Sequence, residues 1–511
     1  MPDPNTCFFA FFSAYSPPIQ GHREHDMRMT FIVLLLGIAG LTDPTPSAAE
    51  IALEPCRIDA GTALGTAEAD CGTLSVPENP DEPAGRQIDL SIAVVPALSV
   101  NPAPDPLVIL AGGPGQSAID AYLMMQPAFE GIRQKRPILL VDQRGTGRSN
   151  LMTCPTPDEA LAAEYDLEYG RELVRECLQS LDGDPALYTT SLAVRDLDRV
   201  RAELGYQEVN LWGGSYGTRV ALHYLRRFPE HTRSVIIDGV APADELLGPM
   251  LANDAQSSLD QLADRCSETP ECADTFGDVA AAVVTLKQKL DSEPVDFAAV
   301  HPRTGEQIDV PLTDDTLAGV LRLSIYSPTT RAILPLLVAQ ALEEDYRLLA
   351  SQALLITESM DGAMAIGMHN SVVCAEDMPF YNDTDRPDGI DDTFMGSVAL
   401  DYMGMVCEEW PAGPIDDDFH EPVTSDKPVL ILSGEFDPVT PPENGARTAE
   451  TLSNSKHIIA PQQGHIVSGL GCVPKLTAGF VASASVADLD DSCVDRLGGM
   501  PFFVSPLGPT P

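Results

Sequence analysis

Positive charge is scarce in this chain of 511 residues, which carries 31 lysines and arginines against 76 aspartates and glutamates, a formal net charge of −45. A surface this negative repels phosphate backbones and anionic lipid headgroups, which excludes nucleic acid and polybasic docking to a membrane. The acids form no long run of like charge, so they predict a solvated surface rather than an acidic tail.

Long hydrophobic runs are also missing, because no apolar stretch of about 18 residues, enough to span a bilayer, occurs along the chain. A shorter run from Phe31 to Leu41 follows Arg28 and precedes the small residues at 47–49. That order is typical of a secretory signal peptide. We therefore expect a leader over residues 1–49, with the signal peptide at about 27–49. We also expect export to the periplasm or the medium and no stable membrane association.

Metal-binding motifs are absent too. The chain has no CxxC pair, and none of its nine histidines stands at ligand spacing from a cysteine, so we expect no metal site. Removing the leader takes Cys7 from the 11 cysteines and leaves an even number, which predicts disulfides in an exported chain. Pairing nearest neighbours in sequence would close five short loops, although other connectivities stay open. The remaining cysteines are Cys56, Cys71, Cys154, Cys177, Cys266, Cys272, Cys374, Cys407, Cys472 and Cys493.

Short apolar runs recur along the chain, and most are unbroken rather than alternating. Such runs are typical of parallel strands that are buried on both faces. Helical stretches at 192–204 and 218–228 lie between them, so we predict an α/β fold with a mostly parallel sheet and flanking helices. The runs are 106–110, 137–141, 209–212, 234–238, 428–432 and 457–460, with an earlier alternating strand at 88–94.

The strand and helix alternation stops between residues 241 and 425 and resumes afterwards. This segment has helical periodicity and contains four of the cysteines. We interpret it as a helical cap inserted into the sheet domain. The predicted organisation is a leader at 1–49, the first part of the sheet domain at 50–240, the cap at 241–425 and the rest of the sheet domain at 426–511.

The motif Gly213-Gly214-Ser215-Tyr216-Gly217 follows the apolar run at 209–212 and opens a helix. In that context a G-x-S-x-G motif holds the serine on a strained strand-to-helix turn with its hydroxyl exposed. The glycines let strand and helix approach closely, and the helix N-terminus favours developing negative charge. We predict that Ser215 is a nucleophile. The alternative is a glycine-rich turn with a structural role only.

A serine nucleophile needs a base and an orienting acid, which follow it in the order acid, then histidine, on loops after later strands. His465 follows the run at 457–460 and is the predicted base. Asp437 follows the run at 428–432 and is the predicted acid. Asp238, at the end of the run at 234–238, is its rival.

The oxyanion of such a reaction needs two backbone N–H donors. The residue after the nucleophile, Tyr216, supplies the first. The second is expected in LAGGPGQS, after the run at 106–110, where Gly112 and Gly113 allow close approach and Pro114 has no N–H to give. We therefore predict Gly113 as the second donor.

Together these motifs resemble the proline iminopeptidase and tripeptidyl aminopeptidase branch of the α/β hydrolases. The resemblance rests on GGPG at 112–115, DQRGTGRS at 142–149 and GSYGT at 214–218, with the later acid and histidine, and it spans most of residues 70–475. From about residue 400 the chain resembles the C-terminal region of secreted tripeptidyl aminopeptidases, the TAP-like branch. The resemblance implies an α/β-hydrolase fold, peptide substrates and no cofactor. Proline iminopeptidases usually carry a histidine where this chain has Ala111, so strict proline specificity is not implied.

Acids of the family's cap bind the substrate's free ammonium group, since a buried cation has to be paired. The segment 371–377 resembles the family's cysteine and acid stretch, which implies Glu376 as the anchor and Asp377 as the next candidate. We therefore predict a secreted serine exopeptidase that removes N-terminal residues or short peptides. The alternatives are a carboxylesterase with the same triad and a non-catalytic binding protein on a hydrolase scaffold. The oligomeric state stays open.

Overall fold

The computed structural model describes residues 51–60, 65–154, 167–360, 362–382, 384 and 386–509. The leader and signal peptide expected at 1–49 lie outside the described residues. Within the described part of the chain, no helix is both long and apolar enough to cross a membrane.

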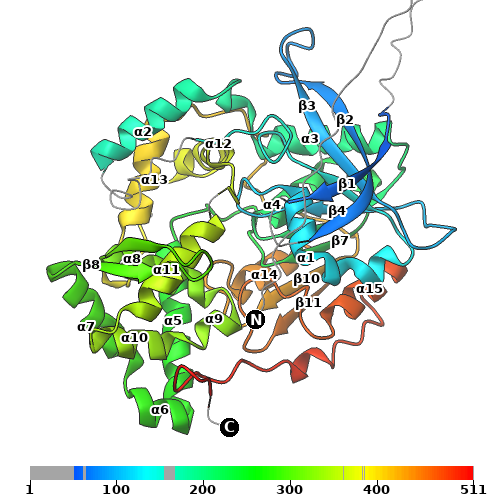
Figure 1. Ribbon diagram of the computed structural model, residues 1–511. Helices are drawn as coiled ribbons and strands as arrows, with labels where there is room; N and C mark the ends of the chain where they lie inside the picture. Colours follow the sequence, from blue (N-terminus) through cyan, green and yellow to red (C-terminus); the bar gives the residue numbers. More distant parts are fainter. Residues whose placement is uncertain are drawn as a thin grey trace, which may run out of the picture. The chain divides into compact units, whose positions relative to one another are not determined.

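Nine strands form the central sheet (Figure 1), in the spatial order β1 (Glu54–Asp59), β2 (Thr66–Pro77), β3 (Gln87–Val95), β5 (Ile138–Val141), β4 (Leu107–Leu110), β6 (Val209–Gly214), β7 (Thr232–Asp238), β10 (Val429–Gly434) and β11 (Ser455–Ala460). The first three strands and the β3–β5 pair are antiparallel, and the other pairs are parallel. The mostly parallel sheet predicted from the apolar runs is confirmed. No such run marks β1 or β2, because exposed and half-buried side chains interrupt their buried ones.

Alternate residues of the central strands enter two hydrophobic cores, since side chains alternate across a strand. In β4, Val108 and Leu110 face the core that includes α3 (Thr190–Glu203) and α4 (Tyr216–Arg227). Leu107 and Ile109 face the other core, with α1 (Ala118–Arg133) and α15 (Val473–Ser483). Burial on both faces explains why these strands read as unbroken apolar runs.

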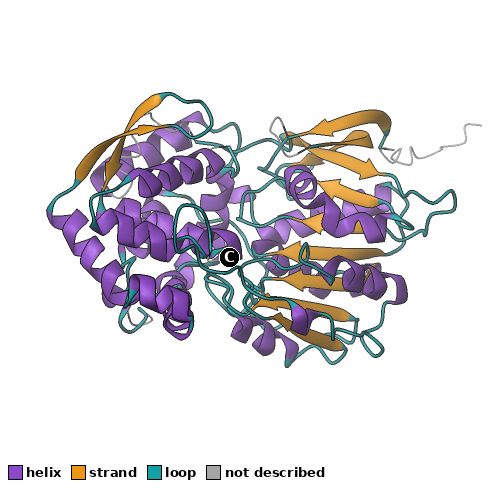
Figure 2. Cartoon of the chain, turned by 60° about the horizontal axis from the view of Figure 1, so that its bottom comes forward, coloured by secondary structure: helices purple, strands orange, loops and turns teal. Residues whose placement is uncertain are grey.

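We use the word cap for residues 241–425, which lie between β7 and β10 in sequence and have a hydrophobic core of their own. Figure 2 shows that helices dominate this segment, although it also holds the antiparallel hairpin of β8 (Val295–Val300) and β9 (Gln307–Leu312). The hairpin departs from the purely helical expectation, because its short strands mix exposed, half-buried and buried side chains and carry no unbroken apolar run. The helices are α5 (Leu251–Glu268), α6 (Pro270–Phe276), α7 (Val279–Ser292), α8 (Asp314–Ile325), α9 (Pro328–Arg331), α10 (Leu334–Leu342), α11 (Arg347–Met360), α12 (Ile366–Glu376) and α13 (Val398–Glu409).

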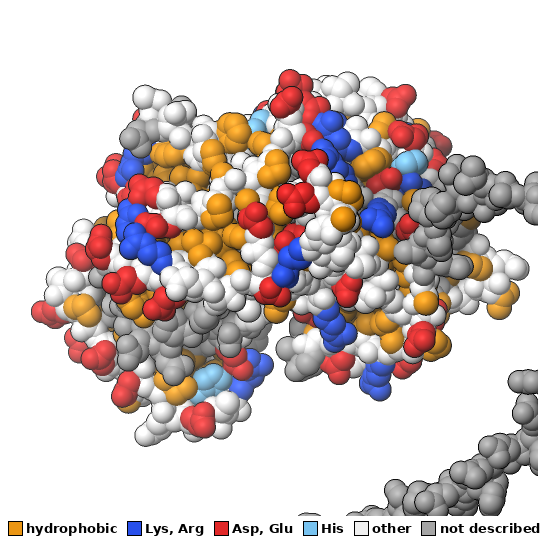
Figure 3. Space-filling model, turned by 90° about the horizontal axis from the view of Figure 1, so that it is seen from above, with side chains coloured by type: hydrophobic (Ala, Val, Ile, Leu, Met, Phe, Trp, Pro, Cys, Tyr) orange, Lys and Arg blue, Asp and Glu red, His pale blue; other side chains and the backbone are white. Residues whose placement is uncertain are grey.

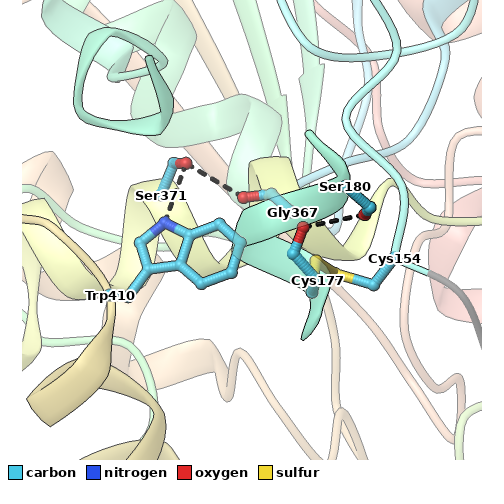
Figure 4. Close-up of a disulfide and its surroundings, with 6 residues drawn as sticks. All are labelled: Cys154, Cys177, Ser180, Gly367, Ser371 and Trp410. Carbon is cyan, nitrogen blue, oxygen red and sulfur yellow. Dashed lines mark hydrogen bonds between the residues drawn. A yellow bond between two sulfur atoms is a disulfide. The ribbon is translucent and has the colours of Figure 1, made fainter. Parts of the chain in front are cut away.

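Five disulfides join cysteines that are nearest neighbours in sequence, one of the connectivities that the sequence leaves open: Cys56–Cys71, Cys154–Cys177, Cys266–Cys272, Cys374–Cys407 and Cys472–Cys493. The second of these ends in α2 (Leu167–Ser180), which precedes the cap in sequence but packs against α13. Close to it, the indole N–H of Trp410 donates to the hydroxyl of Ser371 at 3.1 Å, and that hydroxyl donates to the Gly367 carbonyl (Figure 4). These contacts join α12 to the end of α13.

Two of the cap disulfides allow a direct test of how loop length affects stability. Cys266–Cys272 closes a loop with a sequence separation of 6, and Cys374–Cys407 one with a separation of 33. Closing the longer loop removes more entropy from the unfolded chain, about 4 against about 2 kcal/mol in the chain-entropy model. We expect the double serine variant of the longer loop to lose more unfolding free energy in urea titrations. Equal losses would contradict this explanation.

Candidate active site

Ser215 occupies the turn between β6 and α4 with φ 55° and ψ −127°. A residue other than glycine at this positive φ stores strain of roughly 1–3 kcal/mol. The flanking glycines are required by packing, because a Cβ on Gly217 would overlap with the Leu110 carbonyl oxygen and one on Gly213 would overlap with that of Gly217. The turn therefore holds Ser215 at the carboxyl end of the sheet and at the N-terminus of α4.

Asp238, at the end of β7, connects the Ser215 turn with the loop that carries His465. Its carbonyl oxygen accepts the Ser215 N–H at 2.9 Å. Its fully buried carboxylate accepts the N–H groups of Val467 at 3.0 Å and Ser468 at 2.7 Å, and the Ser468 hydroxyl at 2.5 Å. Burial raises the pKa of Asp238 to about 6 despite these hydrogen bonds. The carboxylate of the rival acid is thus committed to backbone amides rather than to the imidazole.

His465 and Asp437 lie together at the ends of β11 and β10. Nδ1 of His465 is 2.8 Å from Oδ2 of Asp437. The carboxylate is fixed by the N–H groups of Val439 and Thr440, at 3.0 and 2.9 Å, and by the Thr440 hydroxyl at 2.8 Å. A bond at Nδ1 leaves Nε2 on the other side of the ring, where a serine base needs it. The structure brings the two predicted residues together, while their catalytic roles stay predictions.

The His465 loop rests on the residue that follows α8 in the cap. The His465 N–H donates to the Tyr326 carbonyl at 2.9 Å, and the two rings meet edge to face with centroids 5.2 Å apart. Burial by itself lowers the pKa of His465, but the charge and hydrogen bond of Asp437 outweigh burial and raise that pKa above its ordinary value. A raised pKa makes the neutral imidazole a better proton acceptor.

The loop after β4 passes directly beside the predicted nucleophile, because a Cβ on Gly112 would lie 3.1 Å from the Cβ of Ser215. Gly113 follows with φ 104° and an exposed backbone. Tyr216 is the first residue of α4, where the amide has no partner within the helix. Both predicted oxyanion donors therefore lie next to Ser215, and their role stays a prediction.

Glu376 and Asp377, at the end of α12, are both fully buried. Glu376 accepts the N–H of Thr190 at 2.6 Å and its hydroxyl at 2.9 Å, and the same hydroxyl lies 2.6 Å from that of Tyr216. Burial raises the pKa of Glu376 to about 8, against the positive charge of Arg219. Asp377 pairs with Arg219 at 2.8 Å, so its carboxylate already has a cation. Of the two anchors that the sequence suggests, Glu376 is the one without an ion pair among the described residues.

A third acid, Asp254 on α5, lies beside the predicted triad and carries no sequence signal. One turn further along α5, the Ser258 hydroxyl donates at 2.9 Å to the carbonyl of Phe436, which directly precedes Asp437. Burial, and then the charges of Glu245 and Asp437, raise the pKa of Asp254 to about 7. Its carboxylate makes no hydrogen bond or ion pair with any described residue. Only the packing of α5 over this loop reveals it.

Comparison with known proteins finds two family models that match parts of this chain. Residues 105–275 match the model of the alpha/beta hydrolase fold, and these residues include β4, the Ser215 turn and Asp238. The chain has the α/β-hydrolase fold. Residues 393–493 match the model of the TAP-like protein, and they carry Asp437 and His465. The predicted fold and the resemblance to this branch are confirmed.

The relatives of this α/β hydrolase include both peptidases and an esterase. It is 24% identical over 478 residues to the serine protease Hip1 of Mycobacterium tuberculosis (strain H37Rv), covering 86% of this chain and 90% of that one. It is 28% identical over 428 residues to carboxylesterase B of the same strain, covering 75% and 78%. It is 30% identical over 187 residues to a tripeptidyl aminopeptidase of Streptomyces coelicolor, covering 33% and 35%.

The raised pKa of His465 leads to a prediction about pH. The base acts only when unprotonated, so kcat/KM should fall as the pH drops, with a midpoint above the ordinary histidine value of about 6.5. Asp437→Asn removes the charge that raises the pKa and leaves the burial that lowers it. That variant should move the midpoint to lower pH and slow turnover on the order of 10⁴-fold. The pH profile for a neutral chromogenic ester checks both, and an unchanged midpoint would rule out this coupling.

Proposed function

We propose that this α/β hydrolase is an exported serine exopeptidase that removes N-terminal residues or short peptides, of the proline iminopeptidase or tripeptidyl aminopeptidase type. The observation that carries the proposal is the Nδ1 bond of His465 to Asp437, on a loop that Asp238 joins to the strained Ser215 turn. Similarity to a serine protease and to a tripeptidyl aminopeptidase supports a serine peptidase. The five disulfides support export, because such bonds persist in oxidising compartments.

The mechanism assigns one role to each group. Ser215 Oγ attacks the scissile carbonyl carbon while Nε2 of His465 takes its proton, and Asp437 keeps the other proton on Nδ1. The amides of Gly113 and Tyr216 hold the oxyanion. The imidazolium then protonates the leaving amine, and an acyl-enzyme forms. Water, deprotonated by the same imidazole, attacks the acyl carbon, releases the N-terminal fragment and restores the serine.

An exopeptidase also has to recognise the free ammonium group of its substrate, which needs a carboxylate once it is buried. Glu376 is enclosed behind Tyr216 and held by Thr190, whereas Asp254 is only partly buried and its carboxylate is free. The pKa of each acid is raised by burial, and a bound ammonium would favour its charged form. We propose that one of these two acids is the anchor, with Asp254 the more accessible.

A carboxylesterase with the same triad is the second candidate, and the relation to carboxylesterase B supports it. An esterase has no need of a cap carboxylate and would treat free and blocked N-termini alike. A non-catalytic binding protein is the third candidate, and it would be inert towards a fluorophosphonate probe.

The nucleophile and base can be tested by combining their substitutions. Ser215→Ala and His465→Ala should each lower turnover by on the order of 10⁶, and the double variant should be no worse, because triad members act as a unit. Hydrolysis of Pro-, Ala-Ala-Pro- and simple ester chromogenic substrates is the measurement. If the losses of turnover add up in the double variant, Ser215 and His465 do not act as nucleophile and base.

A second test separates exopeptidase from esterase. Acetylating the N-terminus of a good substrate should lower kcat/KM by roughly 10²- to 10⁴-fold, because the anchoring carboxylate loses its partner. Steady-state kinetics with matched free and acetylated peptides measure this ratio. Equal cleavage of both would replace the exopeptidase with an esterase or an endopeptidase.

The anchor itself is identified by comparing Asp254→Asn with Glu376→Gln. Substituting the true anchor should collapse the ratio of free to acetylated substrate towards one. Asp260→Asn is a matched control, since it removes an exposed acid from the same helix, where it only accepts a hydrogen bond from Gln256. If neither Asp254→Asn nor Glu376→Gln changes the ratio, the activity stands and both anchors are wrong.

A further inference from the structure

A guanidinium from the cap lies next to the candidate active site. Arg322 is on α8, and its Nη2 is 3.4 Å from the hydroxyl of Tyr326, whose ring packs against the imidazole of His465. A second histidine, His369 of α12, has its Nδ1 3.3 Å from the Pro114 carbonyl in the loop of the predicted oxyanion donor. The charge of Arg322 contributes, after burial, to the lowered pKa of His369, and it also acts against the raised pKa of His465. Arg322 is therefore within electrostatic reach of both histidines.

This guanidinium has no carboxylate of its own among the described residues. One of its N–H groups donates to the neutral Tyr326 hydroxyl, its Cζ lies 6.0 Å from the centroid of that ring, and its Nε is buried without any acceptor. Acids are abundant in the chain, and Figure 3 shows many of them on the face that it draws, next to hydrophobic side chains. A partly buried cation that stays unpaired in so acidic a chain is poised for an anionic ligand, because a guanidinium binds a carboxylate with two parallel hydrogen bonds.

The position of Arg322 indicates which part of a substrate it meets. The leaving amine has to depart past the imidazole, because His465 gives it the proton. Arg322 contacts the Tyr326 side chain that packs against that imidazole, whereas Asp254 lies on α5, one turn before the Ser258 that binds the loop of Asp437. The cation is thus separate from the proposed ammonium anchor.

We propose that Arg322 binds a carboxylate on the leaving part of the substrate, so that the preferred substrates are short peptides whose leaving fragment is anionic. This inference rests on the proposed function. The carboxylate comes either from the free C-terminus of a short peptide or from an acidic side chain next to the scissile bond. Both present the same two oxygens to the guanidinium.

The experiment compares matched peptides in the unmodified protein. Tetra-alanine with a free C-terminus is compared with its C-terminal amide, and the amide ending in Asp is compared with the amide ending in Asn. Mass spectrometry of the products identifies the bond that is cleaved. We expect the anionic member of at least one pair to have a kcat/KM roughly 10- to 100-fold higher, and the pair with the larger ratio identifies the source of the carboxylate.

Variants of the cation then assign the preference. Arg322→Met should bring the ratio of kcat/KM for the anionic and the neutral peptide close to one. Arg322→Lys should leave an intermediate ratio, because lysine keeps the positive charge but cannot offer two parallel hydrogen bonds to a carboxylate. Arg322→Glu should invert the ratio. Arg303→Met is the matched control, since it removes an exposed cap arginine that is paired with Glu358 and should leave the ratio as it is.

The outcomes separate this inference from the proposed function. If the unmodified protein cleaves neutral peptides but shows no preference for the anionic ones, the role of Arg322 is overturned and the exopeptidase stands. If a preference exists but survives in folded Arg322→Met, which fluorophosphonate labelling of Ser215 verifies, another group binds the carboxylate and the inference is equally overturned. If no peptide is cleaved while a simple ester is, the exopeptidase fails first.

Discussion

The hydrogen bonds of Asp238 hold the site together. Its backbone carbonyl accepts a hydrogen bond from the N–H of Ser215. Its buried carboxylate accepts hydrogen bonds from the N–H groups of Val467 and Ser468, which follow His465 by two and three residues. The turn at Ser215 is strained, and a strained turn persists only where its surroundings hold it. The same side chain orients the loop of the predicted base. Asp238 therefore positions the two loops through hydrogen bonds to backbone amides, whereas Asp437 is the acid that contacts the imidazole.

The cap completes this arrangement from above the strand ends. The His465 N–H donates to the Tyr326 carbonyl, and the Ala365 N–H donates to the Gly115 carbonyl in the loop of the predicted oxyanion donor. The Ser258 hydroxyl donates to the carbonyl of Phe436, which precedes Asp437. Each bond joins a cap residue to a loop that carries a predicted catalytic group. The geometry of the site thus depends on how the cap docks, and the charges that the cap presents are positioned by the same contacts.

Some of the charged groups near the site have a partner within the protein, and others have no charged partner among the described residues. Arg219 and Asp377 neutralise each other in a fully buried pair, and Glu376 is held by Thr190. Asp254 and Arg322 have no charged partner among the described residues. A buried charge without a partner is costly, so open charges beside a reactive centre are better explained by a ligand than by stability.

The sequence by itself predicted the parallel strands and indicated the candidate nucleophile, acid and base in their order, because these depend on local burial and on spacing along the chain. The pairing of the cysteines stayed open in the sequence and was decided by the fold. The sequence could not place β1, β2 or the β8–β9 hairpin, whose buried side chains are too interrupted to form an apolar run. Only the tertiary structure decided between Asp437 and Asp238 as the partner of His465. It alone placed Asp254 and Arg322 at the site, since the direction of a charged side chain on a helix depends on how that helix packs, and no motif encodes it.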